Sequence, residues 1–281
     1  MFRTGNPVLS KSDAFKPAQS WDDLNAQGRG YEAAPPAKAA RVSHMTVQGA
    51  VNKTFLLLAI CMVCAVASWN ISLANPGLAF PLAIGSMLVG VVLTMVMCMK
   101  PASAVVTAPL LGVSEGFFCG AASLLVISWV PKEQLDGSLT LNTGLIFNAI
   151  LLTVGITGGM LAGYSTGLVR FGPGMRKFVV TATMGLAVYA LLSMVASTLG
   201  FFKFATLWDP SNGGLVSVGF SVFVVAIATM NLVLDFEFFQ HGAERKAPKS
   251  YEWVAAGGLL VTMVWLYIEV LRLLAKLQSR D

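Results

Sequence analysis

The sequence predicts an all-α membrane protein, a bundle of seven transmembrane helices, and three observations lead to this fold class. Of the 281 residues, 56% are hydrophobic and only 12% are charged, whereas a soluble domain carries about 25% charged residues on a solvated surface. The apolar residues form seven blocks, each near the ~20 residues that a helix needs to cross the hydrocarbon core. A lipid-facing strand would leave backbone groups unpaired, so the spans are predicted to be helices.

Short connections rich in Gly, Pro, Asn and Asp separate the predicted spans. These run over Thr54–Leu73, Leu78–Met99, Ala102–Val130, Asn142–Thr166, Phe178–Phe202, Gly214–Phe239 and Trp253–Leu274. Residues 1–50 are polar, carry charges of both signs and contain Pro35 and Pro36, a composition typical of disorder. We therefore expect a mostly disordered tail at 1–50 and a seven-helix transmembrane domain at 51–281.

Connections rich in lysine and arginine alternate along the chain with connections that contain few of them. This alternation predicts how the chain is oriented in the membrane. The tail and the start of the first span carry Arg3, Lys11, Lys16, Arg29, Lys38, Arg41 and Lys53. The second, fourth and sixth connections carry Lys100, then Arg170, Arg176 and Lys177, then Arg245, Lys246 and Lys249. The other connections hold Lys132, Lys203 or no basic residue. Because basic loops stay on the cytoplasmic side, we expect a cytoplasmic N-terminus.

The C-terminus departs from this alternation. Seven crossings would place it outside, yet it carries Arg272, Lys276 and Arg280. Either the last helix does not cross fully, or the first six spans fix the topology. Six full spans with a seventh, partly polar helix inside the bundle would satisfy both observations.

Three acids inside the spans are the candidate functional residues: Glu115, Asp235 and Glu269. A carboxylate at the centre of a bilayer helix costs about 2.5–3.5 kcal/mol on insertion scales, so such groups face a cavity, find a partner or titrate. Together they suit a cation path controlled by protonation. Each also has a structural interpretation, because Asp235 could mark the helix emerging among headgroups, Glu269 could pair with Arg272 one turn later, and Glu115 could hydrogen-bond a neighbouring helix.

Glycines at four-residue intervals predict close helix packing in the fourth span. Gly155, Gly159 and Gly163 follow this spacing, which lets two helix backbones approach each other.

The sequence gives no sign of catalysis or of a bound metal. His44 and His241 lie far apart, and the four cysteines fall within apolar segments, where a thiol behaves as a small hydrophobe. No phosphate-binding loop, serine triad or zinc motif is present. We therefore expect no enzymatic activity and no cofactor. We also expect no nucleic-acid partner, because the basic residues are spread over tails and loops rather than on one surface.

Five segments resemble the Bax inhibitor-1/YccA family, especially its bacterial branch with a polar N-terminal extension. They are Arg3–Leu9 (RTGNPVL), Met45–Thr54 (MTVQGAVNKT), Ser114–Gly120 (SEGFFCG), Asn231–Phe236 (NLVLDF) and Trp265–Leu274 (WLYIEVLRLL). Each is weak alone, but their order and spacing, with the helix count, cover essentially the whole chain. The resemblance implies seven helices with the last one central, in a bacterial inner membrane.

The resemblance also implies a function and a site. Family members look like pH-sensitive calcium leak channels in which an acid late in the sixth helix and one in the seventh share a proton and close the pore. These positions fall on Asp235 and Glu269, and a basic latch at the end of the second helix falls on Lys100. Helix rise places Glu269 roughly 28 Å along the last helix and Asp235 about 10 Å from the end of the sixth. The two acids therefore meet only if the connection between these helices extends beyond the membrane, or if the last helix enters it late.

Two functions follow from this resemblance and from the residues. The first is a calcium leak channel in which calcium is the transported ion and Asp235 and Glu269 gate the path. The second is a non-transporting regulator that binds a membrane protease or another membrane complex, with residues 1–50 as the contact segment. In both cases the lipid bilayer surrounds the seven spans.

Overall fold

A computed structural model of the chain describes residues 44–130, 134–135, 138–139, 141–199, 207 and 213–279. Residues 43–281 form one compact unit. Its long helices are α2 (Val47–Ala74), α3 (Ala79–Met99), α4 (Ala104–Ser128), α5 (Thr143–Ser165), α6 (Pro173–Leu199), α7 (Leu215–Glu244) and α8 (Tyr251–Gln278). Short 3₁₀ helices precede α3 (Pro76–Leu78) and α4 (Pro101–Ser103), and two-residue strands β1 (Gln134–Leu135) and β2 (Ser138–Leu139) pair antiparallel.

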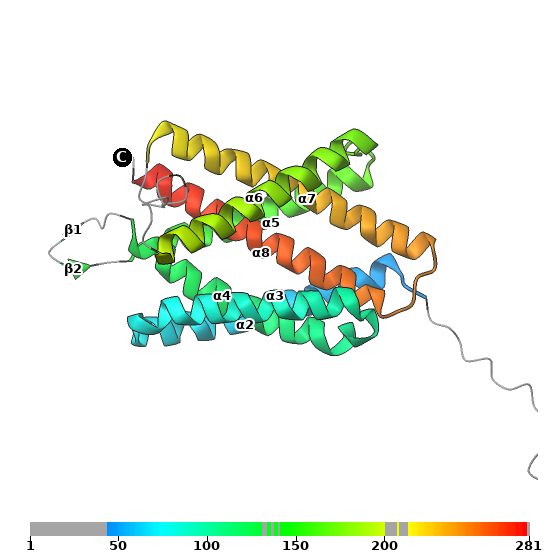
Figure 1. Ribbon diagram of the computed structural model, residues 1–281, viewed down its shortest axis with the longest axis horizontal. Coiled ribbons are helices and arrows are strands. Elements are labelled where there is room, and N and C mark those ends of the chain that lie inside the picture. The colour runs from blue at the N-terminus through cyan, green and yellow to red at the C-terminus, as the bar shows by residue number, and fades with distance from the viewer. Residues whose placement is uncertain are drawn as a thin grey trace, which may run out of the picture. The chain divides into compact units, whose positions relative to one another are not determined.

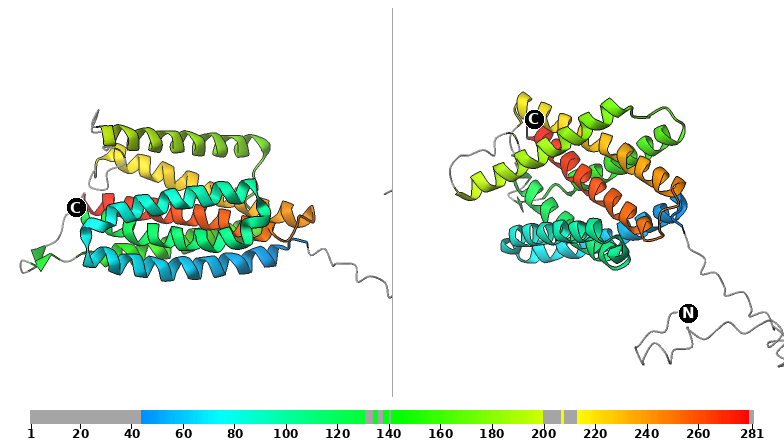
Figure 2. Two further views of the ribbon diagram at one scale, coloured as in Figure 1. Left: turned by 60° about the horizontal axis from the view of Figure 1, so that its bottom comes forward. Right: turned by 45° about the vertical axis from the view of Figure 1, so that its right-hand side comes forward.

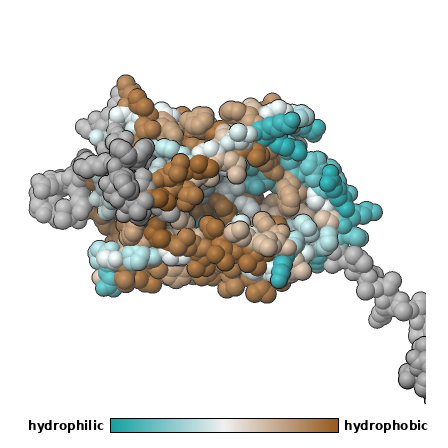
Figure 3. Space-filling view, viewed as in Figure 1, coloured by the Kyte–Doolittle hydropathy of each residue, from teal (hydrophilic) through white to brown (hydrophobic). Residues whose placement is uncertain are grey.

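The seven helices confirm the predicted spans. In the described part of the chain, seven helices are long and apolar enough to cross a membrane, which makes the chain an integral membrane protein. Hydrophobic side chains cover the middle of the face in Figure 3, and hydrophilic ones gather at the end where α7 leads into α8. This distribution matches a unit whose sides face lipid and whose ends face water.

The last helix is central, as predicted. Figure 1 and the right-hand view of Figure 2 show α8 between α2, α3 and α4 on one side and α5, α6 and α7 on the other. Helix α8 contacts α2, α3, α4, α5 and α7. Of its most apolar stretch, 67% is buried, against 11% for α6. Helix α6 packs outside α7, where Leu186, Val224 and Ile227 form a small cluster that reaches Trp265 of α8.

The closest helix approach is between α2 and α4, and glycines of α4 make it. A Cβ on Gly116 would lie 2.4 Å from the carbonyl oxygen of Cys61, and one on Gly120 would lie 2.3 Å from that of Ala65. The hydroxyl of Ser68 donates a hydrogen bond of 2.7 Å to the Phe117 carbonyl across the same interface. Gly116, Phe117 and Gly120 of the segment SEGFFCG therefore pack against α2.

The predicted glycine interface of α5 is wrong within this chain. Gly155 and Gly159 are exposed, and a Cβ on either would meet nothing within 4 Å. A Cβ on Gly163 would meet only Val169, which follows the end of the same helix. The same four-residue spacing in Gly112, Gly116 and Gly120 marks the real interface, because α4 is enclosed between α2, α3 and α8 whereas α5 lies at the surface.

The start of the first helix also differs from the prediction. Helix α2 begins at Val47, inside the segment assigned to the tail, because the Thr46 side chain accepts a hydrogen bond from the Gly49 amide and caps the helix. The expected disorder of residues 1–43 lies outside the described residues.

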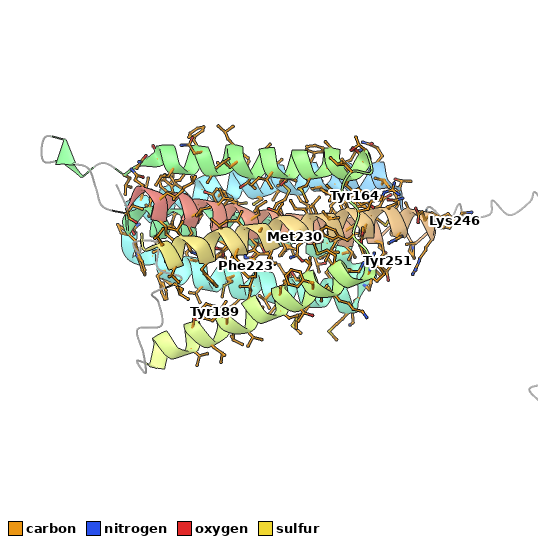
Figure 4. All side chains as sticks on the ribbon, turned by 90° about the horizontal axis from the view of Figure 1, so that it is seen from above. Tyr164, Tyr189, Phe223, Met230, Lys246 and Tyr251 are labelled. Carbon is orange, nitrogen blue, oxygen red and sulfur yellow. The ribbon has the colours of Figure 1, made fainter. Side chains whose placement is uncertain are left out.

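The ends of the long helices lie at two opposite ends of the compact unit. The end that holds the α7–α8 turn also holds Lys53, Lys100, Arg176, Arg245 and Lys249, and we call it the basic end. Figure 4 shows Lys246 at the tip of that turn, with Tyr164 and Tyr251 near it. The opposite end, where α8 ends at Gln278, is called the far end. Helix α8 therefore runs the full length of the unit and does not stop part-way.

Adding a methyl group at the α2–α4 interface should destabilise the protein. For Gly116→Ala we expect a loss of about 2 kcal/mol in unfolding free energy, since a Cβ there overlaps the α2 backbone. The matched control is Gly155→Ala, where the Cβ meets open space, and stability should stay equal or rise by up to ~1 kcal/mol because alanine favours helix. Thermal unfolding of the detergent-purified variants measures both. Equal losses in the two variants would contradict the assignment of the interface to α4.

Candidate functional site

One face of α8 carries most of its polar side chains. Gly258, Thr262, Glu269 and Lys276 are separated by four, seven and seven residues, close to whole turns of a helix with 3.6 residues per turn. Arg272 lies three residues after Glu269, about 60° round the helix from it. We call this set the polar face of α8. Its first part adjoins Asp235 of α7, and its last part adjoins Ser217 and Ser221 of α7.

Asp235 lies against the first part of the polar face. Its carboxyl is next to the Thr262 side chain, and Oδ1 is 4.0 Å from the position of a Cβ on Gly258. Among the described residues, none bonds to the other carboxyl oxygen, Oδ2, which is buried. A buried polar atom without a partner is costly. Asp235 is therefore not simply a residue emerging into headgroups.

Glu269 is fully occupied by Arg272. The guanidinium Nη1 donates to both carboxylate oxygens, at 2.7 Å to Oε1 and 2.8 Å to Oε2, and Glu269 is only 2% exposed. The structural interpretation of Glu269 as an ion-pair partner of Arg272 is thus confirmed. Such a buried pair satisfies two charges that would each be expensive alone.

Lys276 completes the polar face near the far end and is 0% exposed. Its Nζ donates to the Leu207 carbonyl at 2.5 Å, to Ser221 Oγ at 2.8 Å and to the Ser217 carbonyl at 3.3 Å. Counting the basic residues near the C-terminus did not reveal this, because the count treats a lysine there as a loop residue.

Glu115 belongs to a different interface. Its Oε1 is 3.2 Å from the position of a Cβ on Gly90 of α3, and the neighbouring Ser114 hydroxyl donates 2.7 Å to the Ser86 carbonyl of α3. On α8, the residues that meet α4 lie on the side away from the polar face, with Gly257 near Leu111 and Tyr267 bonded to Ser123 at 2.7 Å. The structure therefore does not bring the three candidate acids together.

The expected contact between Asp235 and Glu269 is absent from the structure. Asp235 is level with Thr262, and Glu269 follows seven residues later, roughly 10 Å further along the helix axis. This separation agrees with the helix-length argument made from the sequence. The two acids share a face of α8 but do not share a proton in this conformation.

The expected latch is also absent. Lys100 is exposed where α3 ends, and the described residues show no ion pair between it and Asp235 or Glu269. A different lysine, Lys53 of α2, binds an acid at the basic end.

That acid is Glu252, which sequence reasoning missed. Glu252 is 2% exposed and forms an ion pair with Lys53. Its Oε1 accepts hydrogen bonds from the Thr46 amide at 2.9 Å and the Thr46 hydroxyl at 3.1 Å. A Cβ on Gly49 would lie within 2.6 Å of three carboxyl atoms, so only glycine leaves room. The carboxylate also faces the positive end of the α2 dipole.

The segment before α2 is joined to the α7–α8 turn as well. The Met45 amide donates 2.8 Å to the Ala247 carbonyl, and His44 Nδ1 is 2.9 Å from the Lys246 carbonyl. With the Glu252 contacts, these bonds form what we call the N-terminal clasp, made by His44, Met45, Thr46, Gly49, Lys53 and Glu252. The signal in the sequence was the segment MTVQGAVNKT, which supplies Thr46, Gly49 and Lys53 within about two helical turns.

A groove opens at the basic end between α6 and α7. Its volume is about 610 Å³, and Arg176, Glu237, His241 and Arg245 are among its lining residues. Arg176 Nη2 donates to Glu237 Oε2 at 2.6 Å, which gives the buried carboxylate a partner. The described residues contain no group of three or more His, Cys, Asp or Glu side chains placed to hold a metal ion.

Comparison with known proteins decides the family. A family model described as "Bax inhibitor 1 like" matches residues 6–279. The chain belongs to this family. A comparison with curated proteins found no match. Within this Bax inhibitor 1 like protein, SEGFFCG packs against both α2 and α3, and MTVQGAVNKT lies in the N-terminal clasp. NLVLDF and WLYIEVLRLL lie on the facing surfaces of α7 and α8.

Removing the carboxylate of the N-terminal clasp should destabilise the protein. Glu252→Gln leaves Lys53 without its ion partner at a site of low exposure, for which we expect a loss of about 3 kcal/mol. The control is Glu244→Gln, which removes an exposed carboxylate of α7 and should give no measurable change. Thermal unfolding in detergent measures both.

A second measurement separates the ion pair from general disruption. The double variant Lys53→Met with Glu252→Gln should lose less stability than the two single variants summed, because each single variant leaves a partner uncompensated. Strict additivity would show that Lys53 and Glu252 act independently and that the clasp is not an interacting unit.

Proposed function

We propose that this Bax inhibitor 1 like protein is a non-enzymatic cation leak channel, for calcium in the first place, whose path follows the polar face of α8 where α7 covers it. The observation that carries the proposal is the buried, unpartnered Oδ2 of Asp235. A titratable group at that position, inside an apolar bundle, changes the local charge of the path whenever it gains or loses a proton.

The structure corresponds to the closed state in this proposal. With α7 packed on α8, Asp235 holds a proton, since a charged carboxylate with an unpartnered buried oxygen would be strongly disfavoured. When Asp235 ionises, the negative charge needs water or a cation, and α7 moves away from Gly258 and Thr262 to admit them. The missing Cβ of Gly258 leaves only a small contact to break at this point.

In this proposal Glu269 has a different role from the expected sharing of a proton with Asp235. It is held by Arg272, so its charge is matched while the path is closed. If α7 moves away, the ion pair gains access to water and the carboxylate becomes available to a cation. Carboxylate and hydroxyl oxygens are among the ligands that calcium uses, and the proposed path offers them in Asp235, Glu269 and Thr262.

The basic end is proposed to face the cytoplasm of a bacterial inner membrane. Lys53, Lys100, Arg176, Arg245 and Lys249 lie there, and basic connections stay on the cytoplasmic side. Arg272 and Lys276 lie near the far end but within the bundle, where one binds Glu269 and the other binds α7. They are therefore not loop charges, and the C-terminus belongs to the opposite side.

A second function, regulation of a membrane protease or another membrane complex, is favoured by the N-terminal clasp. Residues 1–43 lead directly into His44 and Met45, which bond to the α7–α8 turn. A partner that binds the preceding segment would therefore act on the start of α8. In this function the chain transports nothing, and the polar tail is the part that the partner contacts.

The leak function predicts a pH dependence that belongs to Asp235. Calcium flux into proteoliposomes should rise with pH, by up to roughly tenfold per unit on the acid side of the midpoint, since the ionised fraction of one carboxyl rises by that factor. Asp235→Asn cannot ionise, and its flux should stay low and independent of pH. The matched control is Glu115→Gln, an acid on the α3–α4 interface, which should keep the wild-type profile.

Two results would contradict this assignment. A pH profile unchanged in Asp235→Asn would remove Asp235 as the sensor, and a profile lost in Glu115→Gln would move the path to α3 and α4.

Deleting residues 1–42 tests the regulatory function. If the tail binds a membrane protease, the deleted variant should lose co-purification with that protease while its calcium flux stays equal to that of the full chain. Retained co-purification would show that the tail is not the contact segment.

A further inference from the structure

We infer that the groove between α6 and α7 binds an anionic phospholipid, with the phosphate between Arg176 and Arg245 and an acyl chain lying along the two helices. The inference does not depend on the leak function, because it assigns a ligand to a surface that the proposed path does not use.

The groove runs from the polar end of the unit into its apolar side. Its lining includes Arg245 and Pro248 at the α7–α8 turn, and also Leu234, which lies ten residues before the end of α7 at Glu244. Ten residues of helix span about 15 Å, whereas the headgroup layer of one leaflet is only about 5–8 Å thick. The groove is therefore long enough to extend from headgroup depth to the depth of the acyl chains.

The polar end of the groove has an excess of positive charge. Arg176 and Arg245 line it together with one carboxylate, that of Glu237. The hydrogen bond to Glu237 uses Nη2 of Arg176, and a guanidinium has five N–H donors. The Arg176 side chain is also 49% exposed, so it can bind a second acceptor without releasing Glu237. The planar guanidinium matches the oxygens of a phosphate group.

The ends of the two helices favour an anion at the same place. Helix α6 begins at Pro173, three residues before Arg176, and the first amides of a helix carry a partial positive charge. The carbonyl groups at the end of α7 would repel an anion, but they accept hydrogen bonds from the amides of Arg245, Lys246 and Ala247. The backbone therefore adds to the attraction of the two arginines.

The deeper part of the groove is apolar and open. Val180 of α6 and Phe238 of α7 line it and are 48% and 44% exposed. Helix α6 packs against α7, and only 11% of its most apolar stretch is buried. A soluble anion would engage the arginines but leave these side chains uncovered, whereas an acyl chain would cover both. Basic pockets between transmembrane helices bind anionic headgroups in this way.

Lipid titration followed by native mass spectrometry tests the inference on the purified full chain. Dioleoylphosphatidylglycerol should bind more tightly than dioleoylphosphatidylcholine, which has the same acyl chains and no net charge. Arg245→Gln should weaken the binding of phosphatidylglycerol about fivefold, the effect of one basic residue at an anionic surface, and leave phosphatidylcholine binding unchanged. The matched control is Lys249→Gln, which removes an exposed charge outside the groove lining and should change neither.

A double variant separates the Arg176 guanidinium from the total charge. Arg176→Gln with Glu237→Gln removes both partners of the ion pair, so the net charge is unchanged and no buried carboxylate is left alone. Phosphatidylglycerol binding should again fall about fivefold. Thermal unfolding in detergent shows whether the variant is folded. If it is not, Arg245→Gln carries the test, since Arg245 is exposed.

Three results would overturn the inference. Equal binding of the two lipids by the wild type would show that the groove does not select an anion. Equal losses in Arg245→Gln and Lys249→Gln would show that the whole basic end, and not the groove, attracts the lipid. Displacement of phosphatidylglycerol by an equal concentration of sn-glycerol 3-phosphate, which has the phosphate but no acyl chain, would make this a site for a soluble phosphate.

Discussion

Charged groups inside an apolar bundle must find partners there, and this constraint explains the arrangement of the helices around α8. That helix carries Glu252, Glu269, Arg272 and Lys276, more ionisable residues than lipid contact would tolerate. Each finds a partner within the bundle. Glu252 binds Lys53 and the start of α2, Glu269 binds Arg272, and Lys276 binds α7 and Leu207. A central position is therefore a requirement of the sequence of α8 rather than an accident of topology.

The two sides of α8 differ in whether their buried polar groups find partners. Toward α3 and α4 the contacts are close and the polar groups are matched, with the Tyr267–Ser123 hydrogen bond and the packing of Gly257 against Met97. Toward α7 the buried Oδ2 of Asp235 has no partner in the described part of the chain. A buried polar atom without a partner is costly, so the α7 side carries a polar group that the closed bundle leaves unsatisfied.

Much of the fold could be predicted from the sequence because hydrophobic length is a strong signal. The seven spans follow from it directly. Helix ends differ from the predicted ones by a few residues, as at Val47, where the Thr46 cap and Glu252 extend α2 among polar residues. Glycine spacing was a weaker signal. It occurs in both α4 and α5, and which of the two is packed depends on the arrangement of the helices, which spacing alone does not contain.

The site was predictable in its residue types but not in its pairings. Acids within spans stand out in any sequence of this composition, so Glu115, Asp235 and Glu269 were found. Helix rise even indicated that Asp235 and Glu269 would be separated, and the position of Asp235 beside Thr262 agrees. Glu252 was missed because it stands at the first turn of its helix, where an acid ordinarily faces water; only the fold shows that the start of α2 covers it.

The C-terminal basic residues show how the same constraint acts on topology. Counted as loop charges, Arg272 and Lys276 oppose a crossing by the last helix. In the structure both side chains are bonded inside the bundle, since Arg272 neutralises Glu269 and Lys276 donates to oxygens of α7. The positive-inside rule concerns residues near the membrane surface, so charges that are bonded within the bundle do not enter it. With these two removed from the count, the seven crossings and the basic end agree, and the apparent conflict in the sequence becomes evidence that the end of α8 is buried.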